Sequence, residues 1–482
     1  MHRVFLAAVL LICLPLTAHA GDSVIQLKVR PTPAPKPALK YYLLPEVREL
    51  TPGNPAQWYF RCFAEQRNFF FNKEVVAQRG RYLKIPLAEL AKEAQRGYGG
   101  FALKQADWAA RLNAVDWQVL EHVQTDGLDM RQPELGPLRV LATALKVRFR
   151  MEVAGQYFDD AIVTAKTMFA LARHLGEHPT RAANQLGLYV ANLALDVLEE
   201  MVQQPNSPNL YWAWTELPTP LVDLRKGFQG ESILIATELQ SLREDAVMTA
   251  DELEKVVSRF SGLMGRSRMQ AGQPPRSLRS DLMARAKDAD KVRALRDRML
   301  KEQETAVYNR IRAQSTARAF FGNLLEMGQA KDVIQKMPPL QVILLNEKRE
   351  FEIQSGERMK LLALSPSQID MLGGEELERG ASCFLADFLP QVIQARREQG
   401  VLERRIALLR HVEALRLYSA SHDGKLPSKL SDIALPLPND PFTDKPIAYR
   451  VEGATARLRG GAPRGEEKNA AYNVLYEVTL QK

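Results

Sequence analysis

Apolar side chains recur at intervals of three and four residues through the middle of the chain, from about residue 56 to residue 400. One such stripe, in residues 137–153, consists of Leu138, Leu141, Leu145 and Phe149. Similar stripes follow at 158–176 and 180–197, and a glycine or a proline separates each stripe from the next. This spacing is that of amphipathic helices, and consecutive helices joined by short turns pack antiparallel. The pattern therefore predicts a mostly α protein, built as an irregular, solenoid-like stack of antiparallel helices.

The same periodicity predicts further helices at 281–302, 304–327 and 340–363. Thr249 and Glu252 have the spacing of a capping box, in which each side chain binds the backbone N–H of the other residue at the start of a helix. These elements extend the predicted helical domain to residue 400.

A small α+β module is predicted for the end of the chain. A helical stripe ends at Gly424, a turn-rich loop follows, and three strand-like runs occupy 447–451, 454–459 and 471–480. Before the helical region, the proline ladder Arg30–Pro37 is typical of extended polyproline II. The predicted division is a signal peptide in 1–20, a proline-rich extended segment in 21–55, a helical domain in 56–400 and an α+β module in 401–482.

The first twenty residues predict export. Met1–Arg3 is basic, Val4–Leu16 is apolar, and Ala18–Ala20 has the small-x-small form of a signal-peptidase site. The apolar run is too short for a transmembrane helix, and no later window is long and apolar enough to span a bilayer. We therefore expect a periplasmic or extracellular protein without a transmembrane segment after cleavage.

Two cysteines, Cys62 and Cys383, follow the expected cleavage site. An oxidising compartment allows a disulfide between them, and the alternative is a pair of buried thiols. Two cysteines alone do not make a structural zinc site.

The net charge of +8 is concentrated in residues 266–301, where eleven Lys and Arg residues accompany four Asp and Glu residues. The arginines proposed for binding in this stretch are Arg276, Arg279, Arg293 and Arg296. A basic exported segment suits a protein or an anionic component of the cell envelope as partner, and the alternative is a solvated helix face. Few aromatic residues interleave with the charges, which disfavours nucleic acid as the partner.

A corner rich in proline and aromatic residues lies at 204–224 and carries Trp212 and Trp214. Large aromatic side chains between prolines commonly lock a corner between helices by burial. The functional alternative is a platform on which a sugar or a peptide stacks.

The strongest catalytic string is His174-Leu-Gly-Glu177-His178, the H-x-x-E-H pattern of inverted zinc proteases. There two histidines bind zinc and the glutamate activates water. Gly176 and Pro179 place this string across a helix end, where the two imidazoles complement the C-terminal dipole instead. A zinc hydrolase is therefore an alternative hypothesis, and no other catalytic motif is found.

The C-terminal module resembles the globular part of the major pseudopilins of type II secretion. The matching residues are Leu415, Tyr418, Gly424, Pro427, Leu430 and Asp440-Pro441-Phe442. The resemblance implies a helix followed by a small sheet, and it implies calcium in the loop, at Asp440 and Asp444. It also suggests a component associated with secretion or pseudopili, as a further alternative.

The whole chain is similar to a family of secreted, mostly helical bacterial proteins. The similarity rests on Pro208-Asn-Leu-Tyr-Trp212 and Asp440-Pro-Phe-Thr443, and it implies architecture without an activity. From the sequence we expect a non-enzymatic helical scaffold or binding protein of the cell envelope that needs no cofactor.

Overall fold

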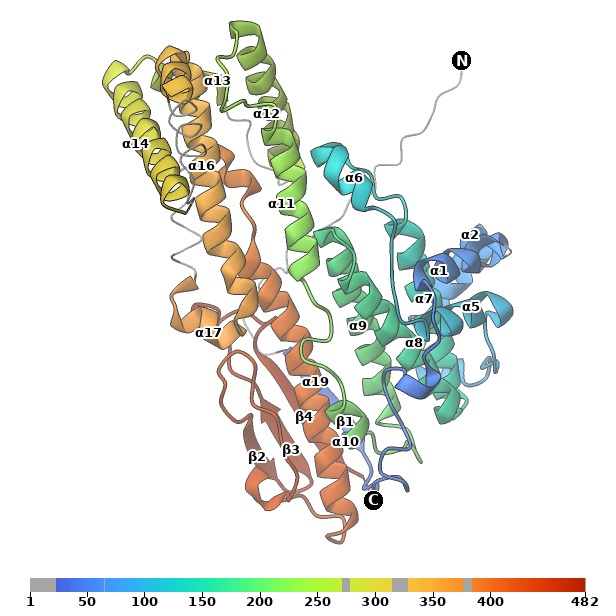
Figure 1. The fold of residues 1–482 in the computed structure, drawn as a ribbon. Coiled ribbons are helices and arrows are strands. Elements are labelled where there is room, and N and C mark those ends of the chain that lie inside the picture. Colours follow the sequence, from blue (N-terminus) through green and yellow to red (C-terminus); the bar gives the residue numbers. More distant parts are fainter. Residues whose placement is uncertain are drawn as a thin grey trace.

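The computed structural model describes residues 23–64, 66–270, 278–313, 328–374, 376 and 384–481. These residues are mostly α-helical and include one small β-sheet, as the sequence predicted (Figure 1). The helices of the first half are α1 (Pro55–Ala64), α2 (Arg67–Phe71), α3 (Lys73–Tyr82), α4 (Leu87–Leu90), α5 (Gly100–Ala110), α6 (Leu120–Thr125), α7 (Leu135–Ala154), α8 (Phe158–Gly176), α9 (Arg181–Met201), α10 (Tyr211–Thr215) and α11 (Arg225–Leu239). Those of the second half are α12 (Ala250–Gln270), α13 (Leu278–Ala286), α14 (Ala289–Ala313), α16 (Pro339–Met359), α17 (Pro366–Met371) and α19 (Val392–Ala420). Nowhere in these described ranges is a helix both long and apolar enough to cross a membrane.

Three consecutive helices, α7, α8 and α9, form the centre of the main core and confirm the three stripes predicted from the sequence. Leu141, Leu145 and Phe149 of α7 are fully buried. The backbones of α8 and α9 approach so closely that a Cβ atom at Gly187 would lie 2.8 Å from the carbonyl oxygen of Ala172. Glycine at this position therefore permits the packing of the two helices.

A second hydrophobic core lies among α12, α13, α14 and α16, at the far end of the molecule from α1 and α5 (Figure 1). The capping box that starts α12 is present: the Glu252 N–H donates to Thr249 Oγ1 at 3.3 Å, and the Thr249 N–H donates to Glu252 Oε2 at 2.7 Å. A third, smaller cluster joins Tyr82, Leu90, Val147 and Met151. The described part of the stretch 56–400, which the sequence predicted as one helical domain, thus contains three separate clusters of buried side chains.

The sheet has the strand order β1-β4-β3-β2, with β1 (Ser23–Val29), β2 (Ala448–Glu452), β3 (Thr455–Arg459) and β4 (Val474–Leu480). The last three strands pair antiparallel and match the strand-like runs predicted for the C-terminal module. Strand β1 pairs parallel with β4, in a register that places Ser23 opposite Val474. The sequence predicted only an extended segment here, although Leu27 and Val29 alternate toward the core as a strand requires.

Helix α19 connects the sheet to the helical body. It begins at Val392, so it crosses the boundary predicted at residue 401, and it packs against α9, α10 and α17. Leu402, Leu408 and Val412 are fully buried along it. Because α19 contacts helices on one side and the sheet module on the other, its remaining surface is where a cleft can form.

Candidate functional site

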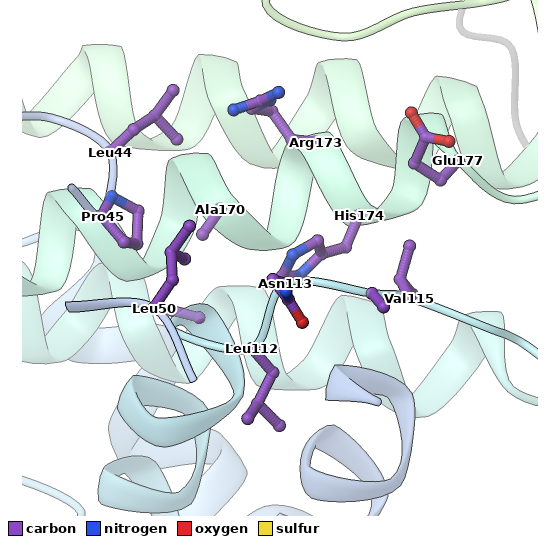
Figure 2. A pocket seen from close by; sticks show the side chains of 12 residues that line it. Leu44, Pro45, Leu50, Leu112, Asn113, Val115, Ala170, Arg173, His174 and Glu177 are labelled. Atoms are coloured by element: carbon purple, nitrogen blue, oxygen red, sulfur yellow. The ribbon is translucent and has the colours of Figure 1, made fainter. Parts of the chain in front are cut away.

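The histidines of the H-x-x-E-H string lie at the end of α8 and face different surroundings. Helix α8 ends at Gly176, so the string straddles the helix end as its sequence indicated. His174 is half-buried, its Nδ1 lies 2.9 Å from the hydroxyl of Tyr59, and desolvation lowers the pKa of its imidazole to about 4. Figure 2 shows His174 on the wall of a cavity of about 390 Å³ that Arg173 and Glu177 also line.

The other two residues of the string are engaged elsewhere. His178 is fully buried, with Nδ1 3.0 Å from Thr180 Oγ1 and Nε2 3.3 Å from Glu134 Oε1. Glu177 forms an ion pair with Lys226. The three side chains therefore do not converge on one point. Over the residues the structure describes, no three His, Cys, Asp or Glu side chains are grouped so that they could hold a metal ion.

In the corner with Trp212 and Trp214, the aromatic side chains pack between helices, as the first of the two alternatives predicted. Only 3% of Trp214 is exposed, and its ring packs edge-on against Phe169 at a centroid distance of 6.2 Å. Trp212 is half-buried against Tyr211, whose hydroxyl donates to the carbonyl oxygen of Pro436 at 2.6 Å. The aromatic side chains thus fasten α10 to α19, and Trp214 reaches the edge of a cavity described below.

The described part of the basic stretch is held largely by intramolecular contacts. Arg279 pairs with Glu254 at 3.0 Å, and Arg293 pairs with Asp290 at 3.4 Å. Arg296 donates to the carbonyl oxygen of Met337 at 2.5 Å. Arg276 lies outside the described residues, as do Cys383 and residues 1–20, for which the sequence predicts a signal peptide. Cys62 is a free, buried thiol, and burial raises its pKa to about 12.

The loop for which the resemblance implied calcium is organised around an arginine. Asp440 is 1% exposed, and its Oδ2 accepts a hydrogen bond from Arg404 Nε at 2.8 Å. Its Oδ1 accepts from the backbone N–H groups of Phe442 and Thr443 at 2.9 and 3.2 Å. The Asp440 oxygens are thus committed to the fold of the loop, whereas Asp444 is exposed.

A cleft runs along one face of α19 and was not predicted from the sequence. One cavity, of about 540 Å³, lies between α19, the loop after α10, the start of α17 and the Asp440 loop. A second cavity, of about 300 Å³, shares Thr219, Ser365 and Glu403 with the first. Together these two cavities are called the α19 cleft. Their size is within the range of sites for small ligands.

The charged residues of the cleft follow the period of the helix. Arg396, Glu403 and Arg410 are spaced seven residues apart, so they project from nearly the same face of α19. Arg396 is anchored, because its Nε and Nη2 donate to the carbonyl oxygen of Leu364 at 3.1 and 2.7 Å. The seven-residue spacing of these charges is visible in the sequence. It does not by itself predict a cleft, because charged positions on a helix ordinarily indicate a solvated face.

Glu403 lies in the wall shared by the two cavities. Its carboxylate is half-buried and makes no hydrogen bond or ion pair with any residue the structure describes. Burial raises the pKa of Glu403 above its ordinary value, and the positive charge of Arg396 partly opposes that rise. An unpaired carboxylate in such a place binds favourably to a group that brings a positive charge or a hydrogen-bond donor.

Arg410 stands at the other end of the larger cavity. Its guanidinium lies over the ring of Tyr211 at 5.2 Å, and Nη2 donates to the carbonyl oxygen of Pro436 at 2.8 Å. Its Nε is buried and has no hydrogen-bond partner among the described residues. The cleft therefore presents an acceptor at Glu403 and an incompletely used donor group at Arg410.

Comparison with known proteins adds no further constraint on this site. No protein-family model matches the chain, no curated protein is significantly similar to it, and no solved structure matches its fold.

Proposed function

We propose that this chain is an exported, non-enzymatic binding protein whose ligand occupies the α19 cleft. The observation that carries the proposal is Glu403, a half-buried carboxylate without a partner among the described residues, in the wall common to both cavities. Export follows from the signal peptide predicted in residues 1–20.

The ligand is a small zwitterion with a protonated amine at one end and a carboxylate at the other. The amine pairs with Glu403, and the carboxylate lies beside Arg410. Seven residues of helix separate these two positions, which is roughly 10 Å along the axis. An extended tripeptide spans about the same distance between its termini. Trp214, Leu217 and Pro218 supply an apolar wall of the larger cavity between the two charged ends.

The remaining polar groups of the cleft support recognition. The hydroxyls of Ser365 and Ser367 lie 2.9 Å apart and bond each other, and Ser365 also caps α17. Asp440 is held by Arg404. These groups are fixed by the fold around Glu403, which suits a site that selects a ligand by charge and length.

Calorimetric titration with triglycine tests the proposal, since this peptide has both charged ends. Triglycinamide and N-acetyltriglycine each lack one of the two charges. We expect triglycine to bind most tightly, with Glu403→Gln reducing its affinity at least tenfold, as the loss of one desolvated charge pair implies.

Glu398→Gln is the matched control. It removes the same charge from α19 at a half-buried position that lines neither cavity, where Glu398 accepts a hydrogen bond from Gln394. The control is expected to bind triglycine as the unchanged protein does. The proposal fails if triglycine does not bind, or if Glu403→Gln and Glu398→Gln bind it equally well.

A further inference from the structure

The solvent-facing side of α5 carries aromatic side chains where a surface helix usually carries polar ones. Ala102, Leu103, Ala106 and Ala109 are buried, and the opposite face exposes Phe101, Lys104 and Trp108. The exposed fractions of Phe101 and Trp108 are 47% and 37%. The positions 101, 104 and 108 are three and four residues apart, so they form one stripe along the helix.

The stripe continues onto α1, which packs against α5. Trp108 contacts Trp58 of α1 edge-on at 5.5 Å and Phe101 edge-on at 5.6 Å. The guanidinium of Arg61 lies over the Trp58 ring at 4.6 Å, and Lys104 Nζ lies 5.9 Å from the Trp108 ring. These five residues form one connected surface, here called the aromatic–basic patch, at the edge of the molecule where α1 and α5 lie (Figure 1).

The charge around the patch is positive. The segment 55–110 has nine Lys and Arg residues and five Asp and Glu residues, a net charge of +4. No carboxylate is exposed on α1 or α5 within the part of the chain that the structure covers. The carboxylate of Asp107, on α5, instead accepts hydrogen bonds from Arg148 at 2.6 and 3.0 Å. An anionic surface that approaches the described residues of α1 and α5 therefore meets the cations Arg61 and Lys104 and no exposed carboxylate of these two helices.

We propose that the aromatic–basic patch docks on an anionic phospholipid bilayer. Exposed Trp and Phe side chains are favourable at the boundary between headgroups and acyl chains, and neighbouring Lys and Arg side chains are attracted to anionic lipids. Stacking of a sugar is disfavoured, because Arg61 covers one Trp58 face and Trp108 is engaged edge-on by two rings. This docking is independent of the α19 cleft.

The experiment is vesicle co-sedimentation of the purified chain after removal of residues 1–20. It compares vesicles of phosphatidylcholine alone with vesicles that contain about 30% phosphatidylglycerol, at low and at high salt. We expect binding to the anionic vesicles that weakens with salt. The double variant Phe101→Ala with Trp108→Ala should lower the partition coefficient about tenfold, because it removes apolar surface that enters the interface. Lys104→Glu should lower it at least about fivefold.

The matched control places similar changes on the exposed surface of α14, where Tyr308 is 65% exposed. Tyr308→Ala with Lys301→Glu is expected to leave vesicle binding unchanged, and it also tests the basic stretch as the membrane-binding surface. Circular dichroism melting curves that match those of the unchanged protein establish that each variant is folded. The proposal is overturned if the anionic vesicles are not bound, if both patch variants bind as the unchanged protein does, or if the α14 control loses as much binding as they do.

Discussion

The desolvated imidazole of the half-buried His174 makes the stability of this protein depend on pH, and His174→Asn tests the size of that dependence. In the folded chain His174 Nδ1 lies 2.9 Å from the Tyr59 hydroxyl, and the ring also bonds the backbone of Leu112. Burial raises the pKa of Tyr59 well above its ordinary value, so its hydroxyl keeps its proton and donates to Nδ1. The imidazole is therefore held neutral.

The magnitude follows from the lowered pKa. Burial, aided by the charge of Arg173, lowers the pKa of His174 from 6.5 to about 4. As pH falls, the His174 imidazole takes up a proton near pH 6.5 in the unfolded chain but only near pH 4 in the folded chain. The contribution of His174 to the free energy of unfolding is therefore complete above pH 6.5, and it is lost as pH falls from 6.5 to 4. At roughly 1.4 kcal/mol for each pH unit, the loss is about 3 kcal/mol.

Urea unfolding at neutral pH and at pH 4 measures this loss. Between neutral pH and pH 4, the free energy of unfolding of the unchanged protein should fall by about 3 kcal/mol more than that of His174→Asn, because asparagine takes up no proton. Any cavity left by the substitution acts at both pH values and cancels. His122→Asn, at an imidazole whose side chain is 63% exposed, is the matched control and should lose as much as the unchanged protein. An equal loss in His174→Asn and His122→Asn would refute the reasoning.

Three further outcomes are expected. Asp440→Asn leaves the fully buried guanidinium of Arg404 without its counter-charge and should lower the free energy of unfolding by about 3–5 kcal/mol, measured by urea titration. Gly230→Ala forces a Cβ atom against a carbonyl oxygen of the turn before α9 and should cost about 1–3 kcal/mol, whereas Gly262→Ala, with open space around it, should not lower the melting temperature. Calorimetry should find weaker triglycine binding as pH falls through the raised pKa of Glu403, because protonation removes the charge that binds the amine.

The helices of the core could be predicted because their apolar spacing and their caps agree. The stripe in 137–153 became α7, and the capping box at Thr249 starts α12. Strand β1 was missed, because the proline ladder that follows it directly led to the prediction of one extended segment for residues 21–55. Its pairing with β4 joins residues about 450 positions apart, and no local pattern specifies such a contact.

The aromatic–basic patch and the α19 cleft were both missed in the sequence, and the reasons are opposite. The stripe of Phe101 and Trp108 has the helical spacing of a core face, yet it faces solvent because Leu103 and Ala106 supply the buried face of α5. The stripe of Arg396, Glu403 and Arg410 has the composition of a solvated face, yet it lines a cleft. In both cases the tertiary packing, and not the spacing along the helix, decides which face is covered.

The buried charges of α19 explain why Glu403 is the residue on which the binding proposal depends. Arg404 meets Asp440 at 2.8 Å, Arg416 meets Glu413 at 2.8 Å, and Arg405 meets two carboxylates of α9. A charge taken out of water without a partner destabilises a fold, so charges that serve structure are paired. Glu403 lies on the same helix and is paired with none of the described residues, although the Arg404 guanidinium is its immediate neighbour in sequence. Because Glu403 is half-buried, its unpaired charge is only partly desolvated, and a ligand that supplies a positive charge offsets this cost. Replacing Glu403 by glutamine should therefore preserve the fold while it abolishes the preference for an amine.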